Sequence, residues 1–310
     1  MRFNRKEDIE FLTKDWQGER FEDGRPKVSD QLLDRLKEVT TEEAVMALIH
    51  KGYMHQFEGD LRRSNLDKEK GRLIGRAVTT VMVPTRLDVH NNLLEEGRSV
   101  EGKRGFFNQW VIETLVKRDV IVVDMFDQIL FGTYVGGNLS TAIKTRTETG
   151  GAVIWGGIRD LEQIVEMEDF QVYYRGVDPT PIGDVMMSGM NVPARIGHAV
   201  CLPGDVVHGT ISGITFIPAH LAEYVAASAE KSHVKDIFGF ERLKQGKYTS
   251  AQIDNAWNLE MMEDFLGWYE QAEAAKKYRE YGLDWTEELE IARNPARPKQ
   301  SDGLVDYKLH

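Results

Sequence analysis

The sequence predicts a layered α/β domain followed by a helical C-terminal extension. Strand-like and helix-like segments alternate through the middle of the chain, several short strand-like segments then follow one another, and the last part reads as helices alone. A chain of 310 residues is long enough to bury a large core. We expect an N-terminal arm over residues 1–27, the α/β domain over 28–245, and the extension with a tail over 246–310.

Composition restricts the class of partner. The formal net charge is -11 and the pI is near 5.3, whereas nucleic-acid binding needs clustered Lys and Arg. Cys201 is the only cysteine, so an intrachain disulfide and a cysteine-based zinc site are excluded. The chain also contains no run of about 18 apolar residues. We therefore expect a cytoplasmic protein that binds neither nucleic acid nor membrane.

Two helices are predicted before the sheet begins. The leucines between residues 32 and 36 have helical spacing, and "TTEEAVMALIHKG" places Thr40 as N-cap and Glu43 as its capping-box partner. Gly52 marks the end of this second helix. Residues 1–27 are polar and include the loop-like "GERFEDGRP", so we expect this arm to be loosely held or to lie on a partner surface.

The middle of the chain supplies the predicted sheet and its covering helices. Val-rich and Thr-rich runs indicate strands, and the segments between them have helical composition or capping residues. The strands are "RLIGRAVTTVMVP", "VIVVD", "AVIW", "FQVYYRG", "RIGHAVCLPGDVV" and "GITFIP". The helices are "FNQWVIETLVKRD", "GGNLSTAIKTRTETGG" and the segment starting "RDLEQIVEM".

The C-terminal part is predicted to be helical. Residues 219–246 form one helix, and a second follows Gly246. Apolar residues at successive i+4 steps favour core or subunit-interface packing over a cofactor site. They are Ile253, Trp257, Met261, Phe265 and Tyr269. The Pro-rich tail over 293–310 is expected to be an arm or a disordered end.

The start of the "GGNLS" helix is a candidate anion site. Asn138 is a suitable N-cap, and the unpaired N–H groups of the first turn, together with the helix dipole, attract a carboxylate or phosphate. Because many helices begin with Gly and Asn for structural reasons, the motif alone does not identify a functional site.

The stretch "GGAVIWGGIRDLEQ" places Arg159 beside Asp160 just after a strand. A surface ion pair is the ordinary explanation. However, this turn and the start of the "GGNLS" helix are expected at the same edge of the sheet, where α/β proteins gather ligands. A guanidinium suits a carboxylate, and an aspartate suits a hard cation. Together these groups predict a site for a metal-chelated 2-oxo acid, in which the metal would stabilise an enolate.

Six segments resemble the RraA-like family, which includes the regulator of ribonuclease activity A and the class II 4-hydroxy-4-methyl-2-oxoglutarate / 4-carboxy-4-hydroxy-2-oxoadipate aldolases. The resemblance covers about residues 28–245. The segments are "RLIGRAVTTVMVP", "VIVVD", "GGNLSTA", "GGAVIWGGIRDLEQI", "YYRGVDPTP" and "CLPGDVVHGTISGITFIP".

This resemblance implies a swivelling β/β/α fold, assembled as a homotrimer or hexamer with sites between subunits. Arg159 matches the arginine that binds the pyruvate carboxylate and keto oxygen. Asp160 matches the direct Mg²⁺ or Mn²⁺ ligand, an aspartate that the non-enzymatic regulators tend to lack. Gly137, Leu139 and Ser140 match the substrate-binding segment, in which Leu139 and Ser140 supply backbone amides to the carboxylate.

Two positions differ from the aldolase pattern. Asn138 stands where the aldolases have an acidic residue that organises a metal-bound water, and an amide cannot act as a carboxylate base. Asp236 is the nearest match to a glutamate that the neighbouring subunit contributes, with Glu241 as an alternative. The candidate catalytic residues are therefore Arg159, Asn138 and Asp236.

The function predicted from these residues is a metal-dependent carbon–carbon lyase, an aldolase or decarboxylase, that releases pyruvate from a 2-oxo acid. Two alternatives stay open. One is a non-catalytic trimeric regulator that serves as a protein-docking platform. The other is elimination or hydrolysis of a sugar-acid derivative on the same metal site. Asp205 in "PGD" is expected to cap a turn, His208 to be structural, and Cys201 to be an inert buried thiol.

Overall fold

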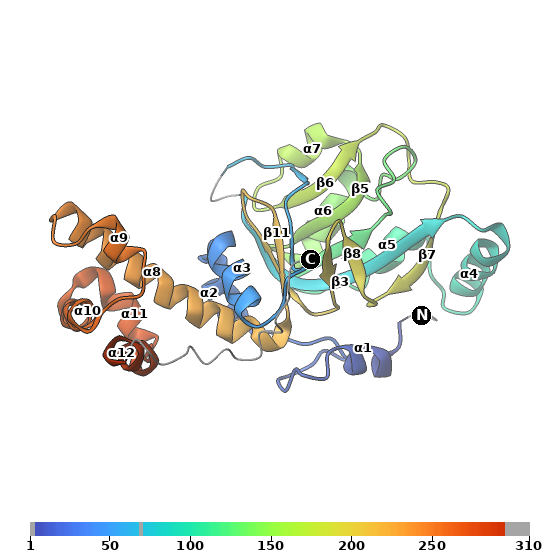
Figure 1. The fold of residues 1–310 in the computed structure, drawn as a ribbon. Coiled ribbons are helices and arrows are strands. Elements are labelled where there is room, and N and C mark those ends of the chain that lie inside the picture. The colour runs from blue at the N-terminus through green and yellow to red at the C-terminus, as the bar shows by residue number, and fades with distance from the viewer. Residues whose placement is uncertain (1–3, 68–70, 295–310) are drawn as a thin grey trace, which may run out of the picture.

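Four parallel strands form the centre of a nine-stranded sheet in the computed structural model, which describes residues 4–67 and 71–294 (Figure 1). These strands are β3 (Leu73–Pro84), β4 (Asp119–Asp124), β5 (Gly151–Ile158) and β6 (Gln171–Val177). The strand order is β1-β11-β10-β3-β4-β5-β6-β2, and β7 also pairs with β3. The predicted α/β class is confirmed.

The antiparallel strands extend the sheet on both sides of this centre. The 12-residue strand β3 pairs with β10 (Val206–Gly209) along its first part and with β7 (Val185–Met190) along its second part. The outer strands are β1 (Phe57–Glu58), β11 (Ile214–Ile217) and β2 (Arg62–Arg63). A separate two-stranded ribbon consists of β8 (Ala194–Ile196) and β9 (Ala199–Cys201).

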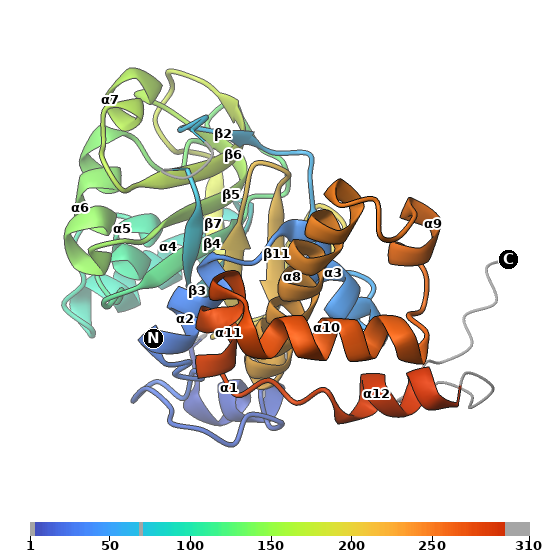
Figure 2. The same cartoon turned by 90° about the vertical axis from the view of Figure 1, so that its left-hand side faces the viewer.

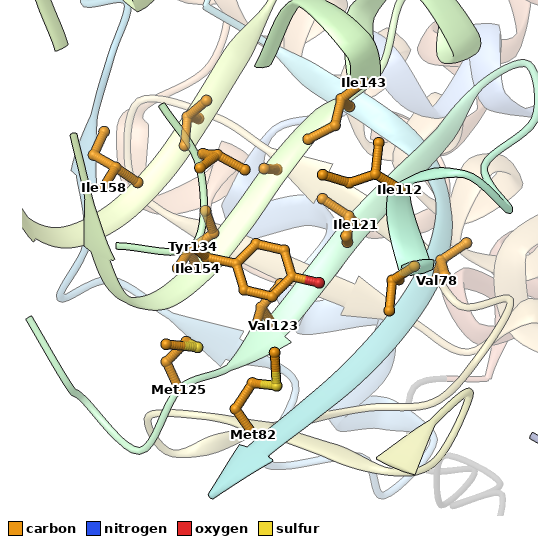
Figure 3. Close-up of a cluster of buried hydrophobic side chains, with 14 of the residues drawn as sticks. Val78, Met82, Ile112, Ile121, Val123, Met125, Tyr134, Ile143, Ile154 and Ile158 are labelled. Carbon is orange, nitrogen blue, oxygen red and sulfur yellow. The ribbon is translucent and has the colours of Figure 1, made fainter. Parts of the chain in front are cut away.

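Side-chain alternation gives the central sheet two buried faces. Ile121 and Val123 of β4 face a cluster that includes Tyr134 (Figure 3) and is covered by α5 (Phe107–Ile112), α6 (Gly137–Thr147) and α7 (Leu161–Val165). Val120 and Val122 face the opposite cluster, which contains residues of the β8–β9 ribbon. Strands buried on both faces explain the continuous apolar runs of the sequence.

Three helices cover the end of the sheet that contains β10 and β11. They are α2 (Asp30–Lys37), α3 (Thr41–His50) and the first part of α8 (Ala222–Lys244), which pack with Ile74, Val206 and Ile217. The Thr40 hydroxyl accepts a hydrogen bond from the Glu43 N–H, and the Glu43 carboxylate accepts one from the Thr40 N–H. The predicted capping box is confirmed.

The N-terminal arm packs on its own chain. It contains an unpredicted helix, α1 (Lys6–Leu12). The loop after this helix places Arg25, whose side chain is 2% exposed, against β3 and β4. The Arg25 guanidinium donates both terminal N–H groups to the Asp119 carboxylate at 3.1 Å. The prediction of a loosely held arm was wrong, because a buried ion pair fixes the arm. The sequence alone did not indicate which of its many charged residues would form this pair.

The helices after α8 lie together at one side of the molecule (Figure 2), and together with the second half of α8 they enclose a separate aromatic core. These helices are α9 (Ser250–Ile253), α10 (Leu259–Gln271), α11 (Lys276–Glu280) and α12 (Thr286–Arg293). The predicted single helix after Gly246 was wrong, because a new helix begins at the Asn258 N-cap. The expected packing role is confirmed, since Trp257, Met261, Phe265 and Tyr269 are buried in this core.

The remaining helices connect these parts. The amphipathic helix α4 (Leu87–Ser99) projects from the end of β3 and was not predicted, and short 3₁₀ turns cover Ala219–Leu221 and Glu273–Ala275. Of the predicted tail over 293–310, all but the first two residues lie outside the described residues. Among the described helices, none combines the length and apolar character needed to cross a membrane.

Candidate active site

The turn after β5 holds Arg159 and Asp160 in a fixed geometry. The Arg159 N–H donates to the Val135 carbonyl at 3.0 Å, and the Asp160 carbonyl accepts the N–H groups of Gln163 and Ile164. Asp160 has left-handed backbone angles, φ 54° and ψ 37°, which aspartate tolerates better than most residues. The turn therefore presents both side chains at the start of α7.

The start of α6 lies directly against this turn. The Gly137 N–H donates to Asp160 Oδ2 at 3.1 Å, and Arg159 Nε lies 3.7 Å from the same oxygen. The sequence therefore correctly predicted that the two loops meet at one edge of the sheet. The helix cap was predicted wrongly: Gly136 is the N-cap, and Asn138 is an exposed residue of the first turn.

Glycine at residues 136 and 137 permits this close approach. A Cβ atom on Gly136 would lie 2.3 Å from Asp160 Oδ2 and 2.9 Å from Arg159 Cγ. A Cβ atom on Gly137 would lie 1.8 Å from Gln163 Oε1. Gln163 is thus a residue of the site that sequence reasoning missed, and its position three residues after Asp160, in the first turn of α7, is the signal that could have identified it.

The first turn of α6 leaves two N–H groups for an anion. The Ser140 N–H donates to the Gly136 carbonyl at 2.9 Å, and the Gly137 N–H donates to Asp160. The N–H groups of Asn138 and Leu139 remain, because the helix has no carbonyl four residues before either of them. The Ser140 N–H, predicted to contact a carboxylate, is thus paired within the helix, whereas the predicted contact from the Leu139 N–H stays a prediction. The Ser140 hydroxyl is buried and has no hydrogen-bond partner among the described residues.

Asp236 does not lie beside this site within one chain. It is an exposed residue on α8, which projects away from α6 and α7 in Figure 1 and lies apart from them in Figure 2. Glu241 lies further along the same helix and accepts hydrogen bonds from its neighbour Arg242 and from Trp268 of the extension. A contribution of Asp236 to the site would require a second subunit and stays a prediction.

The residues of this site fit a hard divalent ion that is held by a single protein carboxylate, that of Asp160. Within the described residues no group of three His, Cys, Asp or Glu side chains converges on a possible metal position. Asp160 Oδ2 accepts the Gly137 N–H, while Oδ1 has no hydrogen-bond donor among those residues, and the side chain is 39% exposed. Mg²⁺ commonly binds through one or two carboxylates and retains several waters.

Other titratable residues singled out in the sequence are buried elsewhere. Burial lowers the pKa of His208 to about 4, and its Nε2 lies 3.0 Å from the Val39 carbonyl oxygen. Burial raises the pKa of the Cys201 thiol well above its usual value. Asp205 accepts the Leu202 N–H in the predicted turn, and burial raises its pKa to about 7. None of these contacts includes Arg159 or Asp160.

The fold and site define a mixed α/β protein with a candidate anion and metal site at the carboxyl edge of parallel strands. Residues 26–216 match the family model RraA-like, described as Aldolase/RraA. The chain belongs to this family.

One curated relative and two solved structures illustrate the relationship. The relative, from Halalkalibacterium halodurans, is named "Putative 4-hydroxy-4-methyl-2-oxoglutarate aldolase" and is 29% identical over 118 residues, 38% of this chain. The match covers 55% of that relative, so the chain spans about half its length.

The solved structures show the fold. One, from microbes associated with the gut ecosystem and described as one of novel cellulases, has a TM-score of 0.57 at 21% identity, covering 74% of this chain and 95% of that chain. The other is Streptomyces coelicolor RraAS2, described as an unusual member of the RNase ES inhibitor RraA protein family. Its TM-score is 0.55 at 23% identity, covering 69% of this chain and 97% of that chain.

Proposed function

We propose that the chain is a divalent-metal-dependent carbon–carbon lyase that releases pyruvate from a 2-oxo acid. The contact among Arg159, Asp160 and the start of α6 carries this proposal, because a guanidinium, a carboxylate and a helix N-terminus lie together there. These are the groups that a 2-oxo acid and a divalent ion would need. Family membership and the aldolase relative support the reaction class.

In the proposed mechanism, Arg159 binds the substrate carboxylate through its planar guanidinium. The N–H groups of Asn138 and Leu139, together with the dipole of α6, hold the same anion. Asp160 would hold Mg²⁺ or Mn²⁺. A bound divalent ion would act as a Lewis acid on the 2-oxo group while the chain's own residues fix the substrate.

Proton handling favours decarboxylation over retro-aldol cleavage in this site. Retro-aldol cleavage requires a base to remove the hydroxyl proton, and Asn138 and Gln163 are amides that cannot do so. Decarboxylation of an oxaloacetate-like acid begins without a base: the carbon–carbon bond breaks, CO₂ leaves and the electron pair moves toward the 2-oxo group. The carbon that lost CO₂ then takes a proton from water, which gives pyruvate. Retro-aldol cleavage would need a base such as Asp236 from a neighbouring subunit.

We also propose that the site is completed in a cytoplasmic homotrimer or hexamer. The side chains of Arg159 and Asp160 are 40% and 39% exposed in the single chain, which leaves room for residues of a second copy. A closed site would exclude water from the developing charge.

Pyruvate release tests the proposal. Oxaloacetate and 4-hydroxy-4-methyl-2-oxoglutarate are supplied with Mg²⁺ or with a chelator, to the natural chain and to Asp160→Ala. We expect metal-dependent pyruvate from oxaloacetate, lost in Asp160→Ala. Asp169→Ala is the control, because Asp169 is another exposed aspartate with positive φ, 49°, and should leave turnover unchanged. Full metal-dependent turnover by Asp160→Ala would contradict the proposal.

Asn138 also favours two other candidates. Without an acid at this position the site could serve elimination or hydrolysis of a sugar-acid derivative, or the chain could be a non-catalytic regulator that docks a partner protein. A protein that binds Mg²⁺ through Asp160 but releases pyruvate from neither substrate would favour these candidates over the lyase.

A further inference from the structure

A separate cavity of about 190 Å³ lies beneath the N-terminal arm. One wall is the end of α1 and the turn after it, and the others come from the segment after α3, from β9 and from the turn after β11. Its lining shares no residue with the Arg159 and Asp160 site. The lining residues are Leu12, Thr13, Asp15, Trp16, Tyr53, Gln56, Val200, Leu202, Asp205, Pro218, Ala219 and His220.

Two aromatic rings line this cavity. The Trp16 indole N–H donates to the Glu19 carbonyl at 2.8 Å, so the polar edge of this ring is already satisfied, and the ring lines the cavity. Tyr53 makes a 3.1 Å hydrogen bond to His220 Nε2. The walls are therefore aromatic and aliphatic, with few unsatisfied donors.

The charge of the lining is negative. Asp15 supplies an exposed carboxylate and Asp205 a buried carboxyl group, and no Lys or Arg is among the described residues that line the cavity. Asp15, Asp205 and Tyr53 line the same cavity, and burial followed by the charges of Asp15 and Asp205 raises the pKa of the Tyr53 phenol. Asp205 is only 4% exposed, so a cation entering the cavity would meet a poorly hydrated carboxyl group.

We propose that this cavity binds a small organic cation, an ammonium group on a short apolar body. Aromatic rings attract ammonium groups, and this attraction strengthens when water is excluded. The volume corresponds to about six water molecules at roughly 30 Å³ each, which suits one small molecule. The negative lining disfavours 2-oxo acids, so this site does not depend on the proposed lyase function.

Three ligands of similar shape and different charge test the proposal by calorimetry: 2-phenylethylamine, 2-phenylethanol and phenylacetate. We expect the amine to bind at least tenfold more tightly than the alcohol, and phenylacetate not to bind. Equal binding of the amine and the alcohol, tighter binding of phenylacetate, or no amine binding at millimolar concentration would overturn it.

Variants locate the binding. Asp15→Asn removes one carboxylate from an exposed position that the fold does not require, and it should weaken the amine about tenfold while leaving the alcohol unchanged. Asp8→Asn makes the same charge change on α1 outside the lining and should change neither ligand. Trp16→Leu should weaken both ligands. An amine affinity unchanged in Asp15→Asn would show that the cation binds elsewhere and refute the assignment.

Discussion

At the scale of single residues, Gly136 controls how closely α6 approaches the turn after β5. Its backbone is extended, so alanine would cause no backbone strain, but the added Cβ would overlap Asp160 Oδ2 and crowd Arg159. We expect Gly136→Ala to lower kcat/KM for the proposed pyruvate release by roughly 100-fold, because displacements near 1 Å in a site cost about this much. Steady-state kinetics measure the loss.

Gly267→Ala is the matched control for this prediction. A Cβ atom on Gly267, within α10, would meet no atom within 4 Å. Alanine in an open helical position stabilises by about 0.5–1 kcal/mol and should not affect turnover. Equal kinetic losses in the two variants would show that the contact between Gly136 and Asp160 is unimportant.

His208 is expected to make stability depend on pH. Burial lowers its folded-state pKa to about 4, whereas the unfolded chain titrates near 6.5, so the unfolded state binds more protons between these values. The contribution of His208 to the free energy of unfolding therefore falls as pH drops through this window. Removing His208 removes that dependence.

The substitution His208→Gln tests this reasoning. We expect the substitution to lower the free energy of unfolding, measured by urea unfolding, and we expect this loss to be roughly 2 kcal/mol smaller at about pH 5 than at about pH 7.5. A glutamine amide can still donate toward the Val39 carbonyl oxygen, so the difference between the two pH values isolates the proton. A loss that is equal at both pH values would mean that His208 has the same pKa in the folded and the unfolded chain.

Individual site residues were predictable only in part. The adjacency of Arg159 and Asp160 to a helix start followed from local sequence and sheet topology. The N-cap was misassigned because Asn138 has capping chemistry, while the observed cap, Gly136, is selected by the space that Asp160 needs. Gln163 was missed because its role comes from contact between two loops.

At the scale of elements, the extension behaves as an aromatic core attached to α8. Phe265 is fully buried, and its ring lies 5.4 Å from Phe238 and 4.7 Å from Trp285. Phe265→Ala should destabilise this core by about 3–5 kcal/mol. Because the sheet clusters do not contain Phe265, hydrogen exchange should lose protection in α10 and retain it in β4.

Phe240→Ala is the control for the extension. Phe240 lies on α8 and is 59% exposed, so its removal should change stability by no more than about 0.5 kcal/mol. Loss of protection in both α10 and β4 on Phe265→Ala would instead show that the extension and the sheet unfold as one unit.

Elements with strong local signals were predicted well, and those set by packing were not. The Val-rich run at β4 is recognisable because both of its faces are buried. Helix α4 was missed because it has no side-chain N-cap and contains Asn91, Asn92 and Gly97, which have low helix propensity. The break between α9 and α10 was missed because Asn258 caps a new helix within an otherwise continuous i+4 pattern.

At the scale of the whole molecule, Arg25 fixes the N-terminal arm to the sheet. Its guanidinium satisfies the buried Asp119 carboxylate, so Arg25→Met would leave that carboxylate without its charge partner. We expect a loss of about 3–5 kcal/mol in the free energy of unfolding, measured by chemical denaturation.

Lys27→Met provides the comparison on the same arm. Lys27 pairs with Glu19 at 3.0 Å, but both side chains are well exposed, so the loss should stay below about 1 kcal/mol. Similar losses in the two variants would show that the Arg25 contribution is no larger than that of a surface ion pair.

The pairing of β3 also has a consequence for the order in which the chain folds. Residues 73–84 pair with β4, β7 and β10, and β10 begins more than 120 residues after β3 ends. At roughly 5–20 residues per second, a ribosome would need about 6–25 s to supply that last neighbour. During this interval the edge of β3 that later pairs with β10 is unpaired and apolar. We therefore expect the nascent chain to depend on chaperones until β10 has been synthesised.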